Sequence, residues 1–229
     1  SITAIIRGGF EYQGQKCSAA SRIYIPKSIS KELISSTVEQ IKSIKIGSPI
    51  DFNNFMNAVI NKNAFKRISN YIEYAKSSDD CEILIGGGYD DSIGYFIEPT
   101  IILSKNHQFK TMKEEIFGPV ITIYVYDDNE WKQMLDVVDK TSDYALTGAF
   151  ISNDEESIKI ALNKLRYSAG NFYINDKPSG AVVGQQPFGG CRASGTDDKA
   201  GSKLNLLRWI SPRLVSRTHN PPTSYQYDY

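Results

Sequence analysis

The chain has 229 residues, of which 41% are hydrophobic and 23% charged, a balance typical of a globular protein with a sizeable core. Its 26 basic residues equal its 26 acidic residues, so the net charge gives no electrostatic footprint for nucleic acid or an acidic membrane. No run of about 18 apolar residues is present, so we expect no membrane span.

The cysteines and histidines give no sign of a disulfide framework or a metal site. Three cysteines lie far apart in the chain, which favours free thiols in a reducing compartment. Together with the two histidines they offer no metal-ligand spacing. The chain begins at Ser1 rather than Met, and we interpret it as a fragment or a processed product. Any targeting segment would then be missing, so its absence says nothing about the compartment.

The first half of the chain alternates helices and strands. In chain order we expect a helix over 2–12, a strand over 21–26, a helix over about 30–43, a loop over 45–57, a helix over 64–75 and a strand over 81–85. The glycines at 86–88 resemble a phosphate-binding loop only superficially. No Lys-Ser/Thr pair follows them and they open no helix, so we expect a turn.

The second half continues the alternation. An extended run over 95–103 contains Pro99, which indicates an edge strand or a bulge. The later elements are a strand over 120–126, a helix over 131–138, a strand over 146–152, a helix over 158–165 and a strand over 171–175. Capping boxes are expected at Asp127 with Glu130 and at Asn153 with Glu156.

This alternation predicts an α/β domain with a largely parallel, twisted sheet and helices on both faces. Ligand sites in such sheets usually lie beyond the carboxyl ends of the strands. The long loop over 176–201 is rich in Gly, Pro, Ser and Gln, and loops of this length are usually functional or disordered. Residues 207–218 read as an extended edge strand that pairs with another chain, and the tail to Tyr229 as loose.

Cys17 is the residue with the clearest chemistry. It follows the predicted first helix, a glycine and Lys16. A thiol held among exposed backbone N–H groups at a helix end ionises more readily than a free cysteine, and those N–H groups can bind an oxyanion. A lone cysteine is more often structural, so this interpretation needs partners elsewhere in the chain.

Three stretches supply those partners: Gly-Gln-Lys-Cys at 14–17, Lys-Glu-Glu-Ile-Phe-Gly-Pro at 113–119, and Gln-Pro-Phe-Gly-Gly at 186–190 followed by Arg-Ala-Ser-Gly at 192–195. Together, and in this order, they resemble the aldehyde dehydrogenase superfamily over essentially the whole chain. Segments 10–18, 125–126, 170–177 and 183–190 look most like its Δ1-pyrroline-5-carboxylate dehydrogenase branch. Those enzymes oxidise L-glutamate γ-semialdehyde to L-glutamate with NAD in proline catabolism.

The resemblance implies a role for each of these stretches. Cys17 would be the nucleophile, forming a thiohemiacetal and then a thioester. Glu115 would accept hydrogen bonds from the hydroxyls of the nicotinamide-side ribose of NAD, and Phe117 would pack near the nicotinamide. Spacing alone favours a solvated loop carboxylate at Glu115, and the Glu-Ile-Phe-Gly-Pro context reverses that preference.

The resemblance also implies how the substrate carboxylate is bound. Its donors would be the Ser18 hydroxyl and the backbone N–H groups of Gly180 and Ala181, where small residues let the backbone approach closely. Where a family member has Ser at 181 this chain has Ala, which keeps the backbone donor. Phe188 would pack on the aliphatic part of the substrate, or it is a core aromatic beneath the loop. Cys81 and Cys191 are interpreted as structural.

The implied domains are a catalytic domain over 1–206 and a C-terminal oligomerisation strand with its tail over 207–229. The superfamily's dinucleotide-binding domain is absent from this chain, and with it the general base and the asparagine that completes the oxyanion hole. We therefore expect the chain to be inactive alone. The intact enzyme would be a homodimer or larger homo-oligomer in the mitochondrial matrix.

Three alternatives stay open. The chain could belong to an aldehyde dehydrogenase with another substrate, which the pattern of Ser18, Gly180 and Ala181 disfavours. It could be a thiol hydrolase pairing Cys17 with His107 or His219, although neither histidine has a neighbourhood that marks it as a base. It could also be a non-catalytic assembly partner that acts only through residues 207–218.

Overall fold

The computed structural model describes residues 1–227. Its main sheet has four strands in the order β1-β6-β5-β2. They are β1 (Arg22–Pro26), β6 (Val120–Tyr126), β5 (Thr100–Ser104) and β2 (Cys81–Ile85). The first three run parallel, and β2 pairs with β5 in the antiparallel direction. The predicted largely parallel α/β sheet is therefore confirmed.

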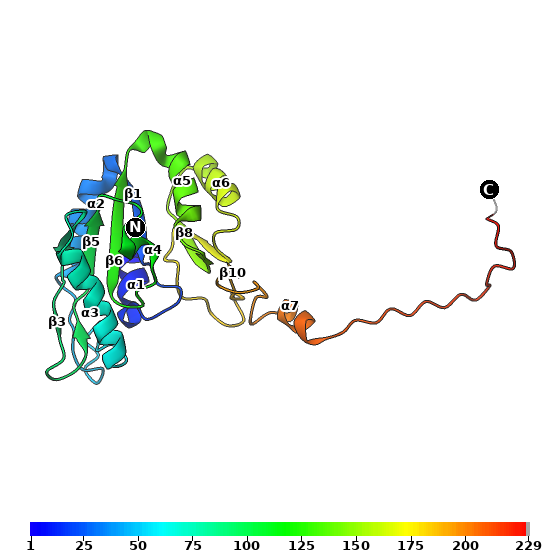
Figure 1. Cartoon of the computed structure of the whole chain (residues 1–229), viewed down its shortest axis with the longest axis horizontal. Coiled ribbons are helices and arrows are strands. Elements are labelled where there is room, and N and C mark those ends of the chain that lie inside the picture. The colour runs from blue at the N-terminus through cyan, green and yellow to red at the C-terminus, as the bar shows by residue number, and fades with distance from the viewer. Residues whose placement is uncertain (228–229) are drawn as a thin grey trace.

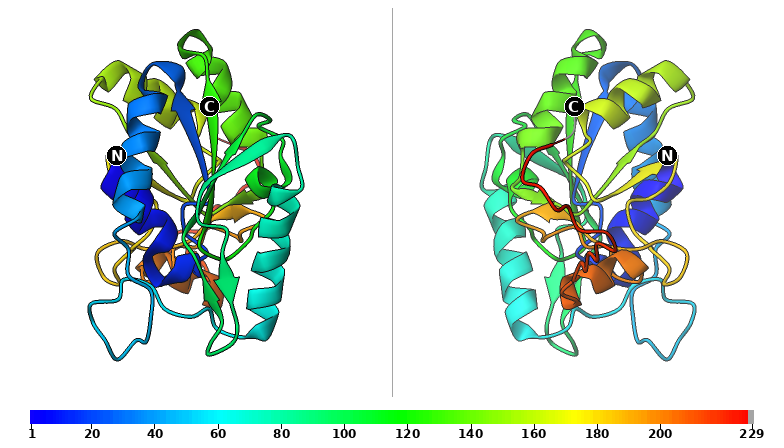
Figure 2. Two further views of the ribbon diagram at one scale, coloured as in Figure 1. Left: turned by 90° about the vertical axis from the view of Figure 1, so that its left-hand side faces the viewer. Right: turned by 90° about the vertical axis from the view of Figure 1, so that its right-hand side faces the viewer.

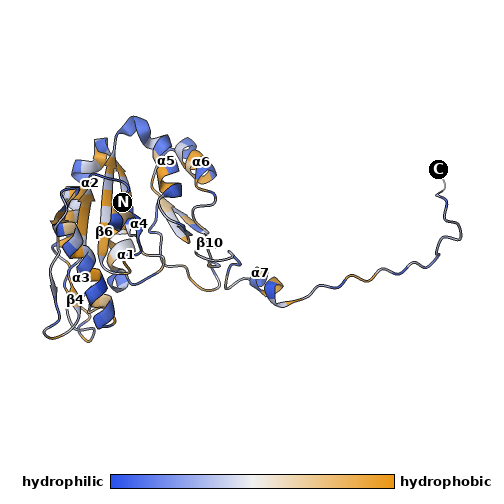
Figure 3. Ribbon diagram, viewed as in Figure 1, coloured by the Kyte–Doolittle hydropathy of each residue, from blue (hydrophilic) through white to orange (hydrophobic). Residues whose placement is uncertain are grey.

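Helices cover both faces of this sheet because side chains along each strand point alternately to opposite sides. α1 (Ile2–Phe10) and α2 (Lys27–Ile41) lie on one face, where Ile121 and Ile123 join their apolar core. α3 (Lys62–Lys76) covers the other face, where Val120 and Ile102 join a second core. Figure 2 shows these helices on opposite sides of the sheet, and Figure 3 shows the apolar strands between them.

A smaller layer lies beside the main sheet. β8 (Thr147–Phe150) and β9 (Asn171–Ile174) form a separate parallel pair. α5 (Trp131–Lys140) and α6 (Glu155–Lys164) pack together against this pair through a third core that includes Leu135, Ala161 and Phe172. Figure 1 shows this layer next to β1 and α1. A cleft described below separates the two layers.

The remaining elements are short. They are η1 (Glu11–Gly14), β3 (Tyr89–Asp90), β4 (Phe96–Ile97), α4 (Lys110–Lys113), η2 (Asp128–Glu130), β7 (Tyr144–Ala145), β10 (Cys191–Arg192), α7 (Lys203–Leu206) and η3 (Leu207–Trp209). Among the described residues, no helix is long and apolar enough to cross a membrane.

The strand around Pro99 differs from the prediction. β5 lies inside the sheet, between β6 and β2, and not at an edge. Pro99 immediately precedes β5, so its missing N–H interrupts no ladder hydrogen bond. The irregularity instead falls in the partner strand β2, where the register shifts between Ile83 and Ile85.

Both predicted capping boxes are wrong. The Asp127 side chain makes no cap hydrogen bond and instead pairs with Lys27, with 3.0 Å between Oδ1 and Nζ. α6 is capped by Asp154 instead of Asn153, through a 2.9 Å hydrogen bond from the Ser157 N–H. At α6 the neighbouring Asp154 takes the capping role from Asn153. At the other site the distant Lys27 binds the Asp127 carboxylate that was expected to cap the helix.

The C-terminal segment forms no strand within the part of the chain that the structure describes. Residues 207–209 form η3, and residues 210–227 extend away from the body (Figure 1). Residues 228–229 of the predicted 207–229 segment lie outside the described residues. A strand that pairs only with another chain has no partner here, so its formation stays a prediction.

Candidate active site

Cys17 follows a tight reversal of the backbone after α1. Tyr12 and Gln13 have φ values of 57° and Gly14 has 65°, which places all three in the left-handed region. The chain then turns over residues 16–19, with the Ala19 N–H donating to Lys16 O at 3.0 Å. Cys17 is exposed, unlike the other two cysteines, and no group among residues 1–227 accepts from its N–H. The exposed thiol and this free N–H fit a nucleophile beside an oxyanion donor.

The candidate site lies at the amino ends of the parallel strands. Cys17 precedes β1, and the 114–119 segment directly precedes β6. β1 and β6 are parallel neighbours, so the two segments meet at one edge of the sheet. This differs from the carboxyl-end location that the sheet type predicts. The difference arises because Cys17 lies on the connection between α1 and the start of β1.

Two glycines bring these segments into backbone contact. A Cβ atom built onto Gly14 would lie 2.3 Å from the carbonyl oxygen of Gly118 and 2.7 Å from that of Gly9. A Cβ atom on Gly118 would lie 2.6 Å from Ile68 in α3. No side chain larger than hydrogen fits at either position without a shift of the backbone or of Ile68. Close packing therefore fixes the backbone just before Cys17 against the 114–119 segment.

Glu115 and Phe117 lie on a segment anchored by α3. The Tyr71 hydroxyl donates to Glu114 at 2.6 Å, and the Arg67 Nε donates to the carbonyl of Ile116 at 3.3 Å. Burial and the hydrogen bond to the Glu114 carboxylate raise the pKa of Tyr71 to about 12. Glu115 and Phe117 flank the buried Ile116 and are both exposed.

One cleft contains these groups. Its volume is about 850 Å³, and it runs between β1 with α1 on one side and β8 with α5 on the other. Cys17, Glu115 and Phe117 all line it. A cavity of this size is within the range that binds small molecules and cofactors. The exposed Glu115 carboxylate in the cleft fits a ligand that presents hydroxyl donors.

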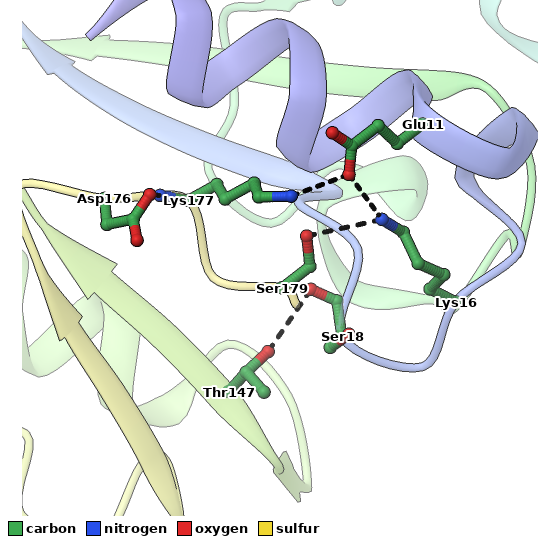
Figure 4. Close-up of polar contacts among 7 residues, drawn as sticks. All are labelled: Glu11, Lys16, Ser18, Thr147, Asp176, Lys177 and Ser179. Atoms are coloured by element: carbon green, nitrogen blue, oxygen red, sulfur yellow. Dashed lines mark hydrogen bonds and ion pairs between the residues drawn. The ribbon is translucent and has the colours of Figure 1, made fainter. Parts of the chain in front are cut away.

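A partly buried ion cluster of Glu11, Lys16 and Lys177 joins the loop after β9 to the Cys17 segment (Figure 4). One carboxylate oxygen of Glu11 contacts the Lys16 ammonium at 3.1 Å and the Lys177 ammonium at 2.7 Å. The Lys16 ammonium also donates to the Ser179 hydroxyl at 3.4 Å. The loop thus returns from the carboxyl end of β9, along α1, to the residue before Cys17.

This cluster keeps Glu11 ionised. Burial raises the pKa of Glu11, but hydrogen bonds and charge from Lys177 and Lys16 outweigh burial and leave the pKa below its ordinary value. A depressed carboxyl pKa contributes stability above the unfolded value of 4.5, and this contribution is lost as the pH falls through the folded value. The Glu11 contacts therefore persist through the neutral range.

The loop brings Ser179, the residue before Gly180, beside Ser18 (Figure 4). Gly180 has φ of 97°, and within the described part of the chain no acceptor pairs with its N–H or with that of Ala181. Ser18 is buried beside the cleft, and its carbonyl accepts from the Thr147 hydroxyl at 3.4 Å. Two neighbouring free N–H groups beside a positive-φ glycine suit an anion.

Phe188 lies apart from this group. It exchanges two backbone hydrogen bonds with Ala200, of 2.9 and 2.8 Å, and its loop is pinned to Asn171. It is half-buried and is not one of the described residues that line the cleft. The structure thus brings Cys17, Glu115 and Phe117 to one cleft. The other predicted site residues are not among the described residues that line it: Ser18, Gly180, Ala181 and Phe188.

Neither histidine can act as a base for Cys17. His107 follows the carboxyl end of β5 and packs its ring against Tyr124, 5.7 Å between centroids. Cys17 lies at the opposite, amino end of this sheet, and a five-residue strand spans about 16 Å. His219 belongs to the extended C-terminal segment (Figure 1). The arrangement gives no support to a thiol hydrolase.

The Glu11 cluster is the feature that the sequence analysis missed. Glu11 and Lys16 are five residues apart, which is not a helical pairing distance, and they meet only because Tyr12 and Gln13 reverse the chain. Lys177 is 166 positions from Glu11. The sequence carries no local signal for either contact, although both lie inside the segments that carry the family resemblance.

Comparison with known proteins identifies the family of the chain. The model of the aldehyde dehydrogenase family matches residues 1–215. The mitochondrial Δ1-pyrroline-5-carboxylate dehydrogenases of Dictyostelium discoideum and Homo sapiens are 57% and 49% identical over the whole chain. The chain spans 41% of the length of each of these relatives.

Solved structures give the same result. The crystal structure of the Mycobacterium tuberculosis Δ-pyrroline-5-carboxylate dehydrogenase matches with a TM-score of 0.85 and 46% identity, over 99% of this chain and 41% of that one. The same enzyme has been solved bound with NAD. The Thermus 1-pyrroline-5-carboxylate dehydrogenase with bound NAD matches with a TM-score of 0.80 and 32% identity, over 90% of this chain and 38% of that one. The chain belongs to the aldehyde dehydrogenase family.

Proposed function

We propose that the chain is the catalytic portion of an NAD-dependent enzyme that oxidises L-glutamate γ-semialdehyde to L-glutamate. The observation that carries this proposal is the exposed Cys17 thiol, on a cleft shared with Glu115 and tied through Lys16 to the loop that holds Gly180 and Ala181. The names of the matching relatives support the same substrate.

The chemistry begins at Cys17. Its thiolate adds to the aldehyde carbon and forms a tetrahedral thiohemiacetal, whose oxyanion accepts a hydrogen bond from the free Cys17 N–H. The Glu115 carboxylate would hold two ribose hydroxyls of NAD, with Phe117 beside the nicotinamide. The C–H hydrogen of the thiohemiacetal leaves as a hydride, for which NAD would be the acceptor, and Cys17 is left carrying a thioester. Water then releases glutamate from the Cys17 thioester with the help of a general base.

The other end of the substrate is an α-carboxylate. We assign it to the Ser18 hydroxyl and to the N–H groups of Gly180 and Ala181, which have no acceptor among residues 1–227. Phe188 is in the same long loop but outside the cleft, so its proposed packing on the aliphatic part of the substrate requires a different placement of this loop in the intact enzyme. Binding both ends selects an aldehyde that carries a carboxylate at a fixed distance from the reacting carbon.

The longer protein would place a dinucleotide-binding domain before residues 1–206 and would assemble through residues 207–218. In that segment Trp209, Leu214 and Val215 are 80, 98 and 77% exposed, an apolar surface that suits pairing with a second copy. We therefore propose a homodimer or larger homo-oligomer. The mitochondrial names of the relatives support a matrix location.

Turnover by different lengths of protein tests this proposal. The 229-residue chain mixed with NAD and glutamate semialdehyde is expected to give no steady NADH production, because the general base and most of the NAD site lie outside it. The full-length gene product is expected to turn over and to prefer the semialdehyde to propanal. Steady turnover by the chain alone, or indifference to the carboxylate, would contradict the proposal.

A further inference from the structure

We propose that Glu11 is a positioning residue that holds the carboxylate-binding loop at a fixed distance from the nucleophile. The proposal rests on the function given above and adds a residue for which the sequence analysis predicted no role. Glu11 itself binds no substrate. It acts through Lys16, which is adjacent to Cys17, and through Lys177, which lies three residues before Gly180.

The polar attachment of the loop runs through this one carboxylate. Apart from the bond of the Lys177 N–H to the side chain of the adjacent Asp176, the hydrogen bonds that join residues 177–181 to the other described residues are those from Lys177 to Glu11 and from Lys16 to Ser179. Glu11 contacts both lysines through a single oxygen, so it sets the position of both ammonium groups together. Without Glu11 the hydrogen bond from Lys177 is lost. The Lys16 ammonium, which donates to Ser179, loses the carboxylate that orients it.

The position of Glu11 is itself fixed from the other side. The Gln13 side chain donates to the carbonyl of Ala58 at 3.3 Å, and the Gln15 side chain accepts from the Ile60 N–H at 2.9 Å. The backbone between Glu11 and Lys16 is therefore tied to the 58–60 segment. Relative side-chain exposures of 29% for Glu11, 24% for Lys16 and 22% for Lys177 show that the cluster is largely shielded from water.

Neutralising Glu11 is expected to affect one class of substrate more than another. In the full-length enzyme, Glu11→Gln should raise KM for glutamate semialdehyde and the inhibition constant for glutamate by about tenfold, the effect of one charge-assisted hydrogen bond. The kcat for the semialdehyde and kcat/KM for propanal should stay within about threefold. Propanal has no carboxylate for the loop to bind, so it reports on Cys17 alone.

Two further variants distinguish positioning from general stability. Lys177→Met should change KM in the same direction as Glu11→Gln but by no more, because it leaves the contacts of Lys16 with Glu11 and Ser179 in place. The double variant should be no worse than Glu11→Gln, because Glu11→Gln already removes the contact with Lys177. Glu73→Gln is the matched control. Glu73 also binds two side chains, Lys76 at 2.8 Å and Tyr89 at 3.0 Å, but on the outer face of α3. It should leave both substrates unchanged.

Crystal structures give a readout that is independent of the proposed substrate. In the full-length enzyme the B-factors of residues 177–181 should rise in Glu11→Gln relative to the parent, while those of α3 should not change. Equal losses with propanal and the semialdehyde, additive effects of the two variants, or unchanged B-factors would each overturn the positioning role. If the parent enzyme ignores the semialdehyde while residues 177–181 respond as expected, the proposed substrate fails and the positioning role stands.

Discussion

Cys17→Ser is expected to lower kcat/KM of the full-length enzyme for aldehydes by at least about 10³-fold, since removing a catalytic nucleophile typically costs this much or more. A serine hydroxyl of the same shape is far less acidic than a thiol, so it forms little of the nucleophilic anion at neutral pH. Binding of NAD should be nearly unchanged, because Cys17 is not assigned to the cofactor. Steady-state rates and a NAD titration measure the two effects.

The other two cysteines are the matched controls. The Cys81 thiol donates to the carbonyl of Ala75 at 3.3 Å and the Cys191 thiol to that of Tyr167 at 3.4 Å. Burial and the charge of Asp80 also raise the pKa of Cys81. Serine at either position should leave the rate within about threefold, and iodoacetamide should label Cys17 first. Retained activity in Cys17→Ser would remove the nucleophile from the mechanism.

Gly14→Ala is expected to lower the free energy of unfolding by about 3 kcal/mol or more. The new methyl group would lie 2.3 Å from the Gly118 carbonyl oxygen, and Gly14 also has a positive φ of 65°. To relieve this clash, either the backbone before Cys17 or the segment that carries Glu115 must move. The Cys17 alkylation rate should therefore change with the stability. Denaturant unfolding of the chain measures the effect.

Gly184→Ala separates the effect of the steric clash from the effect of the positive φ. Gly184 has φ of 84°, but nothing lies within 4 Å of its added Cβ, so only the backbone strain of about 1 kcal/mol is expected. The difference between the two variants is the contribution of the close contacts of Gly14 with the carbonyl groups of Gly118 and Gly9. If Gly14→Ala is no more destabilising than Gly184→Ala, the close contact between the two segments is wrong.

Strong local patterns made much of the fold predictable. β2 and β6 have the predicted bounds: β6 is a continuous run of β-branched and aromatic residues, and β2 is apolar except for Glu82. α3 extends one or two residues beyond the predicted 64–75 range, because Asn61 caps it through the Ala64 N–H. The caps of α5 and α6 were less predictable, since several acidic residues compete at each helix end and tertiary contacts such as Lys27–Asp127 decide between them.

The candidate site was predictable in composition but not in arrangement. Motifs pointed to Cys17 and Glu115, and the structure places both on one cleft. Their location at the amino ends of β1 and β6 depends on where α1 enters the sheet, which no local pattern encodes. The contact between Glu11 and Lys177 depends on the return path of a loop 166 residues later, and sequence periodicity carries no information at that distance.

A crystal structure of the full-length enzyme with bound glutamate tests the central claim most directly. Its α-carboxylate should accept hydrogen bonds of about 2.9 Å from the N–H groups of Gly180 and Ala181. Its γ-carboxyl carbon should lie about 3.5 Å from the sulfur of Cys17. Glutamate bound in the reverse direction, or away from the loop that Glu11 attaches, would contradict the account.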